Sequence, residues 1–138
     1  MKILSVIFLS AIFLSLFSCN SQSSRSAGQT FGNINASEAL AVIEKNLTNE
    51  ELVILDTRTM GEYNQGHIEN SLFLDFSAKD FYTRVSALDK NKTYLVYCNS
   101  GRRSAITMDF MKKNGFNNAW NLEGGIIAWQ RAGFTLVK

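Results

Sequence analysis

Apolar and polar residues alternate in blocks along the chain, and their spacing changes from block to block. From about residue 31 onward, short apolar runs typical of strands buried in a parallel sheet are separated by longer segments with helical spacing. The runs that predict strands are 52–55, 71–74, 93–97 and 119–122. The segments that predict helices follow Asn35, cover 81–88 and 102–113, and follow Gly125. Strands separated by helices predict an α/β fold, with a parallel sheet covered by helices on both faces.

Local chemistry marks where some of these helices begin and end. Asn35 and Glu38 have the spacing of a capping box, which opens the first helix. Asn114-Gly115 is a typical helix end after 102–113. Within that segment Ile106, Phe110 and Met111 share one side, and we expect Phe110 to be a core residue, as is Trp129 in the final helix.

The first 17 residues have the pattern of an export signal. One lysine precedes an apolar and serine-containing run of about fifteen residues, which is shorter than the roughly 20 that span a bilayer. The run ends in Leu16-Phe17-Ser18-Cys19, which resembles the lipobox of bacterial lipoproteins, although Phe17 stands where a small residue is usual. The alternative is an ordinary cleaved signal in which Cys19 has no role. We therefore predict a signal peptide over 1–18.

The segment after Cys19 is polar, rich in small residues and aperiodic, which is typical of a flexible tether. We predict a tether over 19–33 and one folded domain over 34–138. A lipidated Cys19 would anchor this domain to a membrane of the bacterial cell envelope, exported and facing the periplasm.

Composition adds bounds on the function. The 138 residues suffice for one domain, and the formal net charge of +2 gives no electrostatic case for nucleic-acid binding. The two cysteines, Cys19 and Cys98, stand in different sequence contexts, and a disulfide between a tether and the core is rejected. A single histidine, His67, and scattered carboxylates give no metal-ligand spacing, so we expect neither a metal nor a cofactor.

Candidate chemistry gathers where the strand 93–97 ends. Cys98 follows the strand, Asn99, Ser100 and Gly101 form a short loop, and a helix begins at Arg102. Backbone N–H groups of such a loop, together with a helix N-terminus, stabilise an anion and lower the pKa of a thiol. A drop of about two pKa units from about 8.5 would leave the thiol mostly ionised at pH 7, and the thiolate is the nucleophile.

Two adjacent arginines, Arg102 and Arg103, follow the loop. Cations in the first turn of a helix oppose its dipole and should cost stability, so a functional reason is expected. A bound anion or a buried carboxylate would compensate. The alternative is that both arginines are solvated and that Cys98 is an inert apolar residue.

Three motifs in this order resemble the rhodanese-domain sulfurtransferases. The loop CNSGRRS is similar to the family's active loop, in which CxxGxR precedes a small residue, here Ser104. LDTRTMGEYNQGHIENSLFL resembles the family's first motif, and NLEGGIIAW, with Gly124, Gly125 and Trp129, resembles its closing motif. The three together cover about residues 52–130.

The resemblance implies a rhodanese-like fold with a central parallel five-stranded sheet. It implies that Cys98 takes a sulfane sulfur from a small anionic donor such as thiosulfate, becomes a persulfide and passes the sulfur to cyanide, a small thiol or a protein thiol. Residues 99–103 would bind the donor, with Arg103 closing the loop against Asp56 or Glu62 and Arg102 pointing out towards the anion. By the family pattern, Asp56, Arg58, Glu62 and Ser104 support the loop, and His67 is a structural hydrogen-bonding residue.

Two other functions remain open from the sequence. The first is a phosphatase or arsenate reductase. Dual-specificity phosphatases have five residues between the cysteine and the arginine of their loop. Here only four residues separate Cys98 from Arg103, so this loop is one residue shorter. A binding or regulatory module built on an inactive domain is the second alternative, although inactive members commonly lack the cysteine that is present here.

Overall fold

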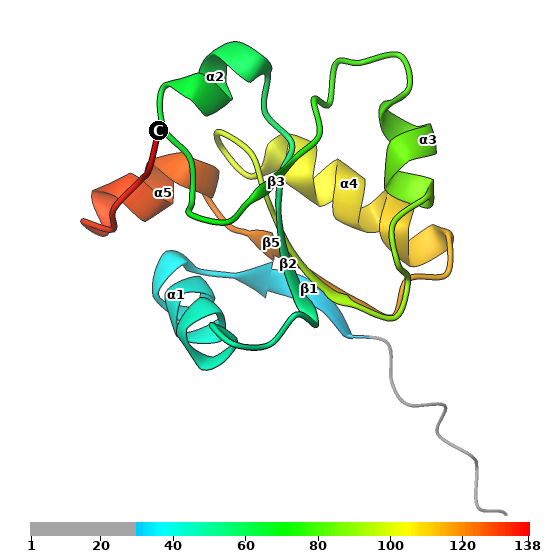
Figure 1. Cartoon of the computed structure of the whole chain (residues 1–138), viewed down its shortest axis with the longest axis horizontal. Coiled ribbons are helices and arrows are strands. Elements are labelled where there is room, and N and C mark those ends of the chain that lie inside the picture. The colour runs from blue at the N-terminus through cyan, green and yellow to red at the C-terminus, as the bar shows by residue number, and fades with distance from the viewer. Residues whose placement is uncertain (1–29) are drawn as a thin grey trace, which may run out of the picture.

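The computed structural model describes residues 30–138 and builds them into one five-stranded parallel sheet with five helices (Figure 1). The strands lie in the order β1-β5-β4-β2-β3. The elements in chain order are β1 (Thr30–Ile34), α1 (Ala36–Lys45), β2 (Leu52–Asp56), α2 (Met60–Asn64), β3 (Leu72–Phe73), α3 (Phe81–Ser86), β4 (Thr93–Tyr97), α4 (Arg102–Lys113), β5 (Asn118–Leu122) and α5 (Gly125–Arg131). The α/β class, the parallel sheet and its five strands are as expected from the sequence.

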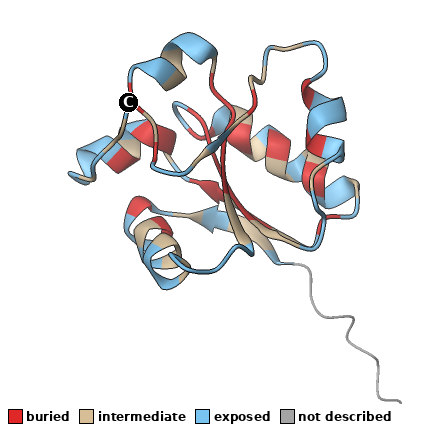
Figure 2. Ribbon diagram, in the orientation of Figure 1, coloured by how far each residue is buried: buried red, intermediate tan, exposed pale blue. Residues whose placement is uncertain are grey.

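The sheet separates two apolar cores, because successive side chains of a strand point to opposite faces. On one face α1 and α5 pack over Ile54, Leu95 and Leu122. On the other face α3 and α4 pack over Leu55, Val96 and Ala119. The buried strands lie between exposed outer faces of the helices (Figure 2). β4 lies in the middle of the sheet and ends at Tyr97, so Cys98 follows at the carboxyl edge.

Helix ends follow the predicted local chemistry. Asn35 caps α1 in a reciprocal capping box with Glu38, and Asn114 ends α4 with its N–H bonded to Phe110 and Met111 carbonyls. A second capping box, between Thr59 and Glu62, opens the short helix α2, which the apolar pattern does not predict. Five residues are too few for a helical repeat of apolar positions to be visible.

The domain begins earlier than predicted. Residues 30–34 form β1, paired in parallel with β5 from Thr30↔Asn118 to Ile34↔Leu122, so residues 30–33 belong to the sheet and not to a tether. The sequence TFGNI has no apolar run because β1 is an edge strand of partly exposed residues. The predicted signal peptide, Cys19 and the rest of the predicted tether lie outside the described residues.

Two side chains of α4 are less buried than predicted. Met111 is fully buried, but Ile106 is 44% exposed, and Phe110 is half-buried and packs against the edge of the core between the sheet, α3 and α4. Both instead lie at the surface beside the exposed Tyr82 of α3, with the Tyr82 and Phe110 ring centroids 4.7 Å apart.

Among residues 30–138, no helix combines the length and the apolar character needed to cross a bilayer.

Candidate active site

Cys98 stands directly after the most buried strand of the sheet. Tyr94 to Tyr97 of β4 are buried, and Cys98 itself is 1% exposed. The Cys98 loop, residues 98–101, then turns into α4. Gly101 is the N-cap residue of α4 and has φ +89, a left-handed conformation that favours glycine. The predicted order of strand, short loop and helix is therefore present, with Cys98 at the end of the strand.

Hydrogen bonds converge on the sulfur of Cys98. The N–H of Gly101 donates to Sγ at 3.2 Å, and the hydroxyl of Ser104 donates to it at 3.4 Å. Burial is the largest single influence and raises the pKa of the thiol, because it disfavours the thiolate. Bonds from the Ser104 side chain and from the N–H groups of Ser104, Ser100 and Gly101 outweigh burial, and the pKa of Cys98 falls below its ordinary value.

Arg103 turns inward and pairs with Glu62, one of the two carboxylates expected from the sequence. Its two terminal nitrogens donate to the two carboxylate oxygens at 2.9 and 2.7 Å, a bidentate pair that joins the start of α4 to α2. The hydrogen bond with Arg103 is the main cause that lowers the pKa of Glu62 to about 2, with smaller contributions from Thr59.

Asp56 pairs with Arg58 and not with Arg103. The pair is buried, with nitrogen–oxygen distances of 2.7 to 3.1 Å, and Arg58 also donates to the carbonyl of Gly66 at 2.8 Å. The guanidinium of Arg58 lies 5.5 Å from the ring centroid of Tyr97, the residue before Cys98. The four charged residues thus form two separate pairs, and the Asp56–Arg58 pair lies near Tyr97, the residue that precedes the Cys98 loop.

The remaining loop residues face solvent. Asn99, Ser100 and Arg102 are exposed, and Arg102 forms no ion pair with any residue between 30 and 138. Arg102 therefore leaves one positive charge without an ion pair at the first residue of α4, directly after the Cys98 loop. Arg102 and Arg103, adjacent in sequence, have different surroundings, as the sequence pattern leads one to expect.

His67 has the structural surroundings expected of it. Its ring stacks on Tyr63 with centroids 3.8 Å apart, and Nδ1 lies 3.3 Å from the Tyr63 carbonyl oxygen. Its backbone exchanges hydrogen bonds with Val137, which ties the end of the chain to this turn.

Several residues that support the site are not evident from the family motifs alone. Thr57 donates twice to the carbonyl of Tyr97, from its N–H at 2.9 Å and its hydroxyl at 3.0 Å. The Tyr97 hydroxyl accepts from the N–H of Ile68 at 3.1 Å and contacts Ser71 at 3.2 Å. The Thr59-x-x-Glu62 spacing is that of a capping box and could have been recognised in the sequence. The contacts of Thr57 and Tyr97 join segments far apart in the chain, so no local sequence pattern predicts them.

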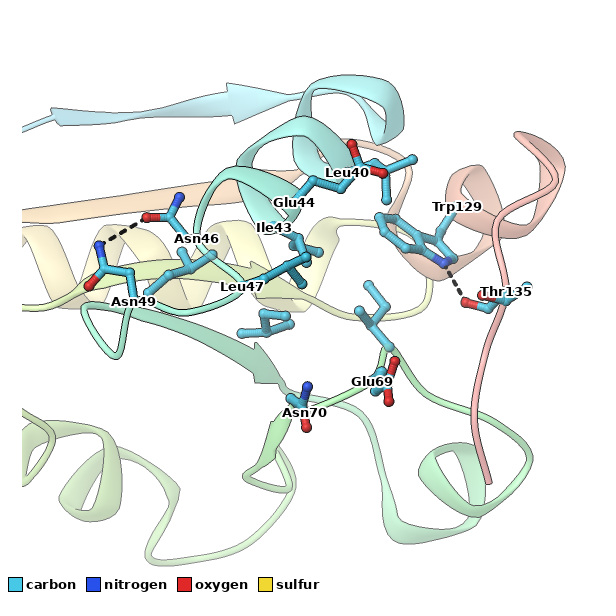
Figure 3. A pocket seen from close by; sticks show the side chains of 13 residues that line it. Leu40, Ile43, Glu44, Asn46, Leu47, Asn49, Glu69, Asn70, Trp129 and Thr135 are labelled. Atoms are coloured by element: carbon cyan, nitrogen blue, oxygen red, sulfur yellow. Dashed lines mark hydrogen bonds between the residues drawn. The ribbon is translucent and has the colours of Figure 1, made fainter.

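A hollow among the described residues lies away from the Cys98 loop. It is a groove of about 480 Å³ between α1, β2 and α5, and its apolar walls include Leu40, Ile43 and Trp129 (Figure 3). Cys98 does not line it. The bonds to the sulfur, the charge pairs and the exposed Arg102 all point to the Cys98 loop as the reactive centre, so the groove is not counted as part of the candidate site.

Comparison with known proteins agrees with this geometry. The family model of the rhodanese-like domain matches residues 39–132. A sulfurtransferase of Allochromatium vinosum is 31% identical over 104 residues, which are 75% of this chain and 95% of that protein. A tRNA uridine(34) hydroxylase of Enterobacter sp. strain 638 is 34% identical, but the match covers 74% of this chain and only 31% of the hydroxylase.

Solved structures give the same result. The crystal structure of a rhodanese-related protein from Thermoplasma volcanium superposes with a TM-score of 0.63 at 30% identity, covering 76% of this chain and 96% of that one. Family model, relative and structure agree over most of the described residues. The chain belongs to the rhodanese-like domain family.

Proposed function

We propose that the protein is a sulfurtransferase in which Cys98 carries a sulfane sulfur between a small anionic donor and a thiol acceptor. Membership of the rhodanese-like family supports sulfur-transfer chemistry in general. The observation that carries the specific proposal is the set of hydrogen bonds on the Cys98 sulfur, which favour the thiolate at the end of a buried strand.

In the first step, the Cys98 thiolate attacks the outer sulfur of thiosulfate. A new sulfur–sulfur bond forms, the original sulfur–sulfur bond of thiosulfate breaks, and sulfite leaves with the electron pair. Cys98 is then a persulfide with its negative charge on the outer sulfur. Loop N–H groups that stabilise the thiolate also suit this charge, because an oriented set of N–H donors binds an anion.

In the second step, a thiolate acceptor attacks the outer sulfur of the persulfide. The bond to Cys98 breaks, its electron pair returns to Cys98 as thiolate, and the acceptor leaves as a persulfide. Cyanide can replace the thiol and leaves as thiocyanate. The protein ends each cycle in its starting state, so no external oxidant or reductant is needed.

The other site residues have supporting roles in this proposal. The exposed Arg102 attracts the anionic donor, and Asn99, Ser100 and Gly101 form the wall around the sulfur. Arg103 and Glu62 fix the start of α4, while Asp56 and Arg58 hold the base of the loop beside Tyr97. Ser104 donates to the sulfur from the first turn of α4.

The deciding experiment is the intact mass of the purified protein after incubation with thiosulfate. We expect a gain of one sulfur atom, lost on adding cyanide or a thiol, and no gain in Cys98→Ser. A regulatory module without activity would gain nothing in either protein. A phosphatase would instead hydrolyse an aryl phosphate in a Cys98-dependent way, and that result would replace the proposal.

The likeness to tRNA uridine(34) hydroxylases does not extend the proposal to tRNA. Less than a third of those proteins is matched, and the near-neutral net charge of this chain gives no electrostatic case for RNA binding. Sulfur transfer is the function that the described residues support best.

For location, we propose that the domain is exported and anchored to a membrane of the cell envelope through a lipid on Cys19. The support is the sequence alone: a lysine, an apolar run and the Leu16–Cys19 pattern. Cys19→Ser should release the protein from the membrane fraction without changing the specific activity of the domain. A variant that stays with the membrane would contradict the lipid anchor.

A further inference from the structure

The glycine pair of the closing motif lies against the Cys98 loop. Gly124 and Gly125 open α5, and the next two N–H groups bond to the loop: Ile126 donates to the Cys98 carbonyl at 2.9 Å and Ile127 to the Asn99 carbonyl at 3.2 Å. The first N–H groups of a helix have no partner within the helix, so they are free to hold another segment. Here that segment is the one that bears the thiol.

Holding these two carbonyls also orients the opposite sides of their peptide groups. In a planar trans peptide, the carbonyl and the following N–H point in opposite directions. The Asn99 carbonyl points to α5, so the N–H of Ser100, on the other side of the same peptide plane, points away from α5. That N–H is among the groups whose hydrogen bonding favours the Cys98 thiolate.

Gly125 is the residue that allows this close approach. A Cβ atom at this position would lie 2.5 Å from the carbonyl oxygens of both Cys98 and Asn99, closer than Cβ atoms come to other atoms in proteins. Both obstructing atoms are backbone, so the loop itself would have to move. The positive φ of +60 adds a second reason for glycine.

The helix that makes these contacts is itself fixed. Trp129 of α5 is 4% exposed in the core shared with α1, and its indole N–H donates to the Thr135 carbonyl at 3.0 Å (Figure 3). A fixed helix can set the position of a loop, whereas a mobile one would follow it.

We propose that the first turn of α5 is a positioning element for the reactive thiol: Ile126 and Ile127 hold the loop carbonyls so that the loop N–H groups face the Cys98 sulfur, as that of Gly101 does at 3.2 Å. Gly125 is the positioning residue that admits the contact. The inference rests on the proposed role of Cys98. It assigns to the closing motif a task in thiol activation, beyond packing.

The test compares two pairs of variants. Gly125→Ala introduces the clash, while Gly133→Ala is its control, because Gly133 also has a positive φ, of +82, but nothing within 4 Å of an added Cβ. Ile127→Pro removes the N–H donor, and Ile127→Ala removes the exposed side chain but keeps the N–H. Proline is tolerated in a first helical turn, where the N–H has no partner within the helix.

The readout is the rate at which iodoacetamide alkylates Cys98 as a function of pH, with a melting curve for each variant. We expect the pH of half-maximal rate to rise by about one unit in Gly125→Ala and Ile127→Pro. At pH values well below the parent's midpoint the rate should then fall about tenfold, because the thiolate fraction there falls in proportion. Both controls should keep the parent's pH profile.

A folded Gly125→Ala or Ile127→Pro protein with the parent's pH profile would overturn the proposal. If Gly125→Ala does not fold, Ile127→Pro decides, and an Ile127→Pro protein that also fails to fold counts against it, since a positioning contact is not required for folding. Alkylation does not depend on sulfur transfer. A parent protein that gains no sulfur from thiosulfate therefore refutes the proposed function while leaving this test valid.

Discussion

At the residue scale, two opposed influences act on the Cys98 thiol. Burial favours the neutral thiol, whereas the hydrogen bonds from the Gly101 N–H and the Ser104 hydroxyl favour the thiolate and lower its pKa. The loop spacing alone predicts an activated cysteine, but the contribution of the Ser104 hydroxyl depends on how α4 turns after Gly101. The sequence also left Asp56 and Glu62 as equal candidates for Arg103. Arg58, two residues from Asp56, occupies that carboxylate, and only the folded chain shows it.

Removing the Ser104 hydroxyl should raise the pKa of the Cys98 thiol. In Ser104→Ala the pH of half-maximal alkylation should move upward, and the rate well below the parent's midpoint should fall about three- to tenfold, in step with the thiolate fraction. Ser100→Ala is the matched control, because it removes an exposed hydroxyl and keeps the N–H. An unchanged pH profile in Ser104→Ala would mean that the backbone N–H groups alone favour the thiolate.

Removing the charge of Arg102 should weaken donor binding without affecting the chemical step. Arg102→Ala should raise the KM for thiosulfate with little change in kcat, which is the sign of lost uniform binding. The effect should shrink at high ionic strength, because an exposed charge is screened. Arg84→Ala, which removes another exposed arginine at the end of α3, should leave KM unchanged. A fall in kcat for Arg102→Ala would instead mean that Arg102 interacts with the donor mainly in the transition state.

At the scale of elements, the helices and strands that could be predicted from the sequence are those with the most extensive burial. β2 and β4 are recognisable because both faces are covered and their sequences are continuous apolar runs. β1 and α2 are not: one is a partly exposed edge strand, and the other is five residues long. α2 nevertheless matters for the site, because its Glu62 holds Arg103 and thereby joins α2 to the helix that follows the thiol.

The ion pair between α2 and α4 should make stability depend on pH. The pKa of Glu62 is about 2 in the folded protein and about 4.3 when unfolded, so the stabilisation is complete above about pH 4.3 and is lost as pH falls towards 2. The difference in unfolding free energy between the parent and Glu62→Gln, measured by urea denaturation, should shrink over that range. Glu69→Gln is the control, since Glu69 is exposed and forms no ion pair with residues 30–138. A difference that stays constant between pH 5 and about 2.5 would contradict this reading.

At the scale of the whole molecule, the reactive loop is held by segments far apart in the chain. β4, which leads into the loop, has β2 on one side and β5 on the other. The start of α4 is held by α2, and the loop carbonyls are held by α5. The three family motifs contain these segments, which is why the fold and the position of Cys98 could be predicted together. β1 lies outside those motifs, and its pairing with β5 could not be predicted from them.

The last prediction concerns the start of the domain. β1 completes the sheet beside β5, the Ile34 carbonyl accepts from the N–H of Glu123 at 2.9 Å, and Phe31 and Ile34 pack against the two cores. A chain of residues 35–138 should therefore be less stable than one of residues 30–138 by about 2–4 kcal/mol, the cost of uncovering two half-buried side chains. It should also aggregate more readily, because β5 becomes an exposed edge. Urea denaturation and light scattering of the two chains measure this. Equal stability would show that the folded domain begins at residue 34, as the apolar pattern indicates, and that β1 only lies along it.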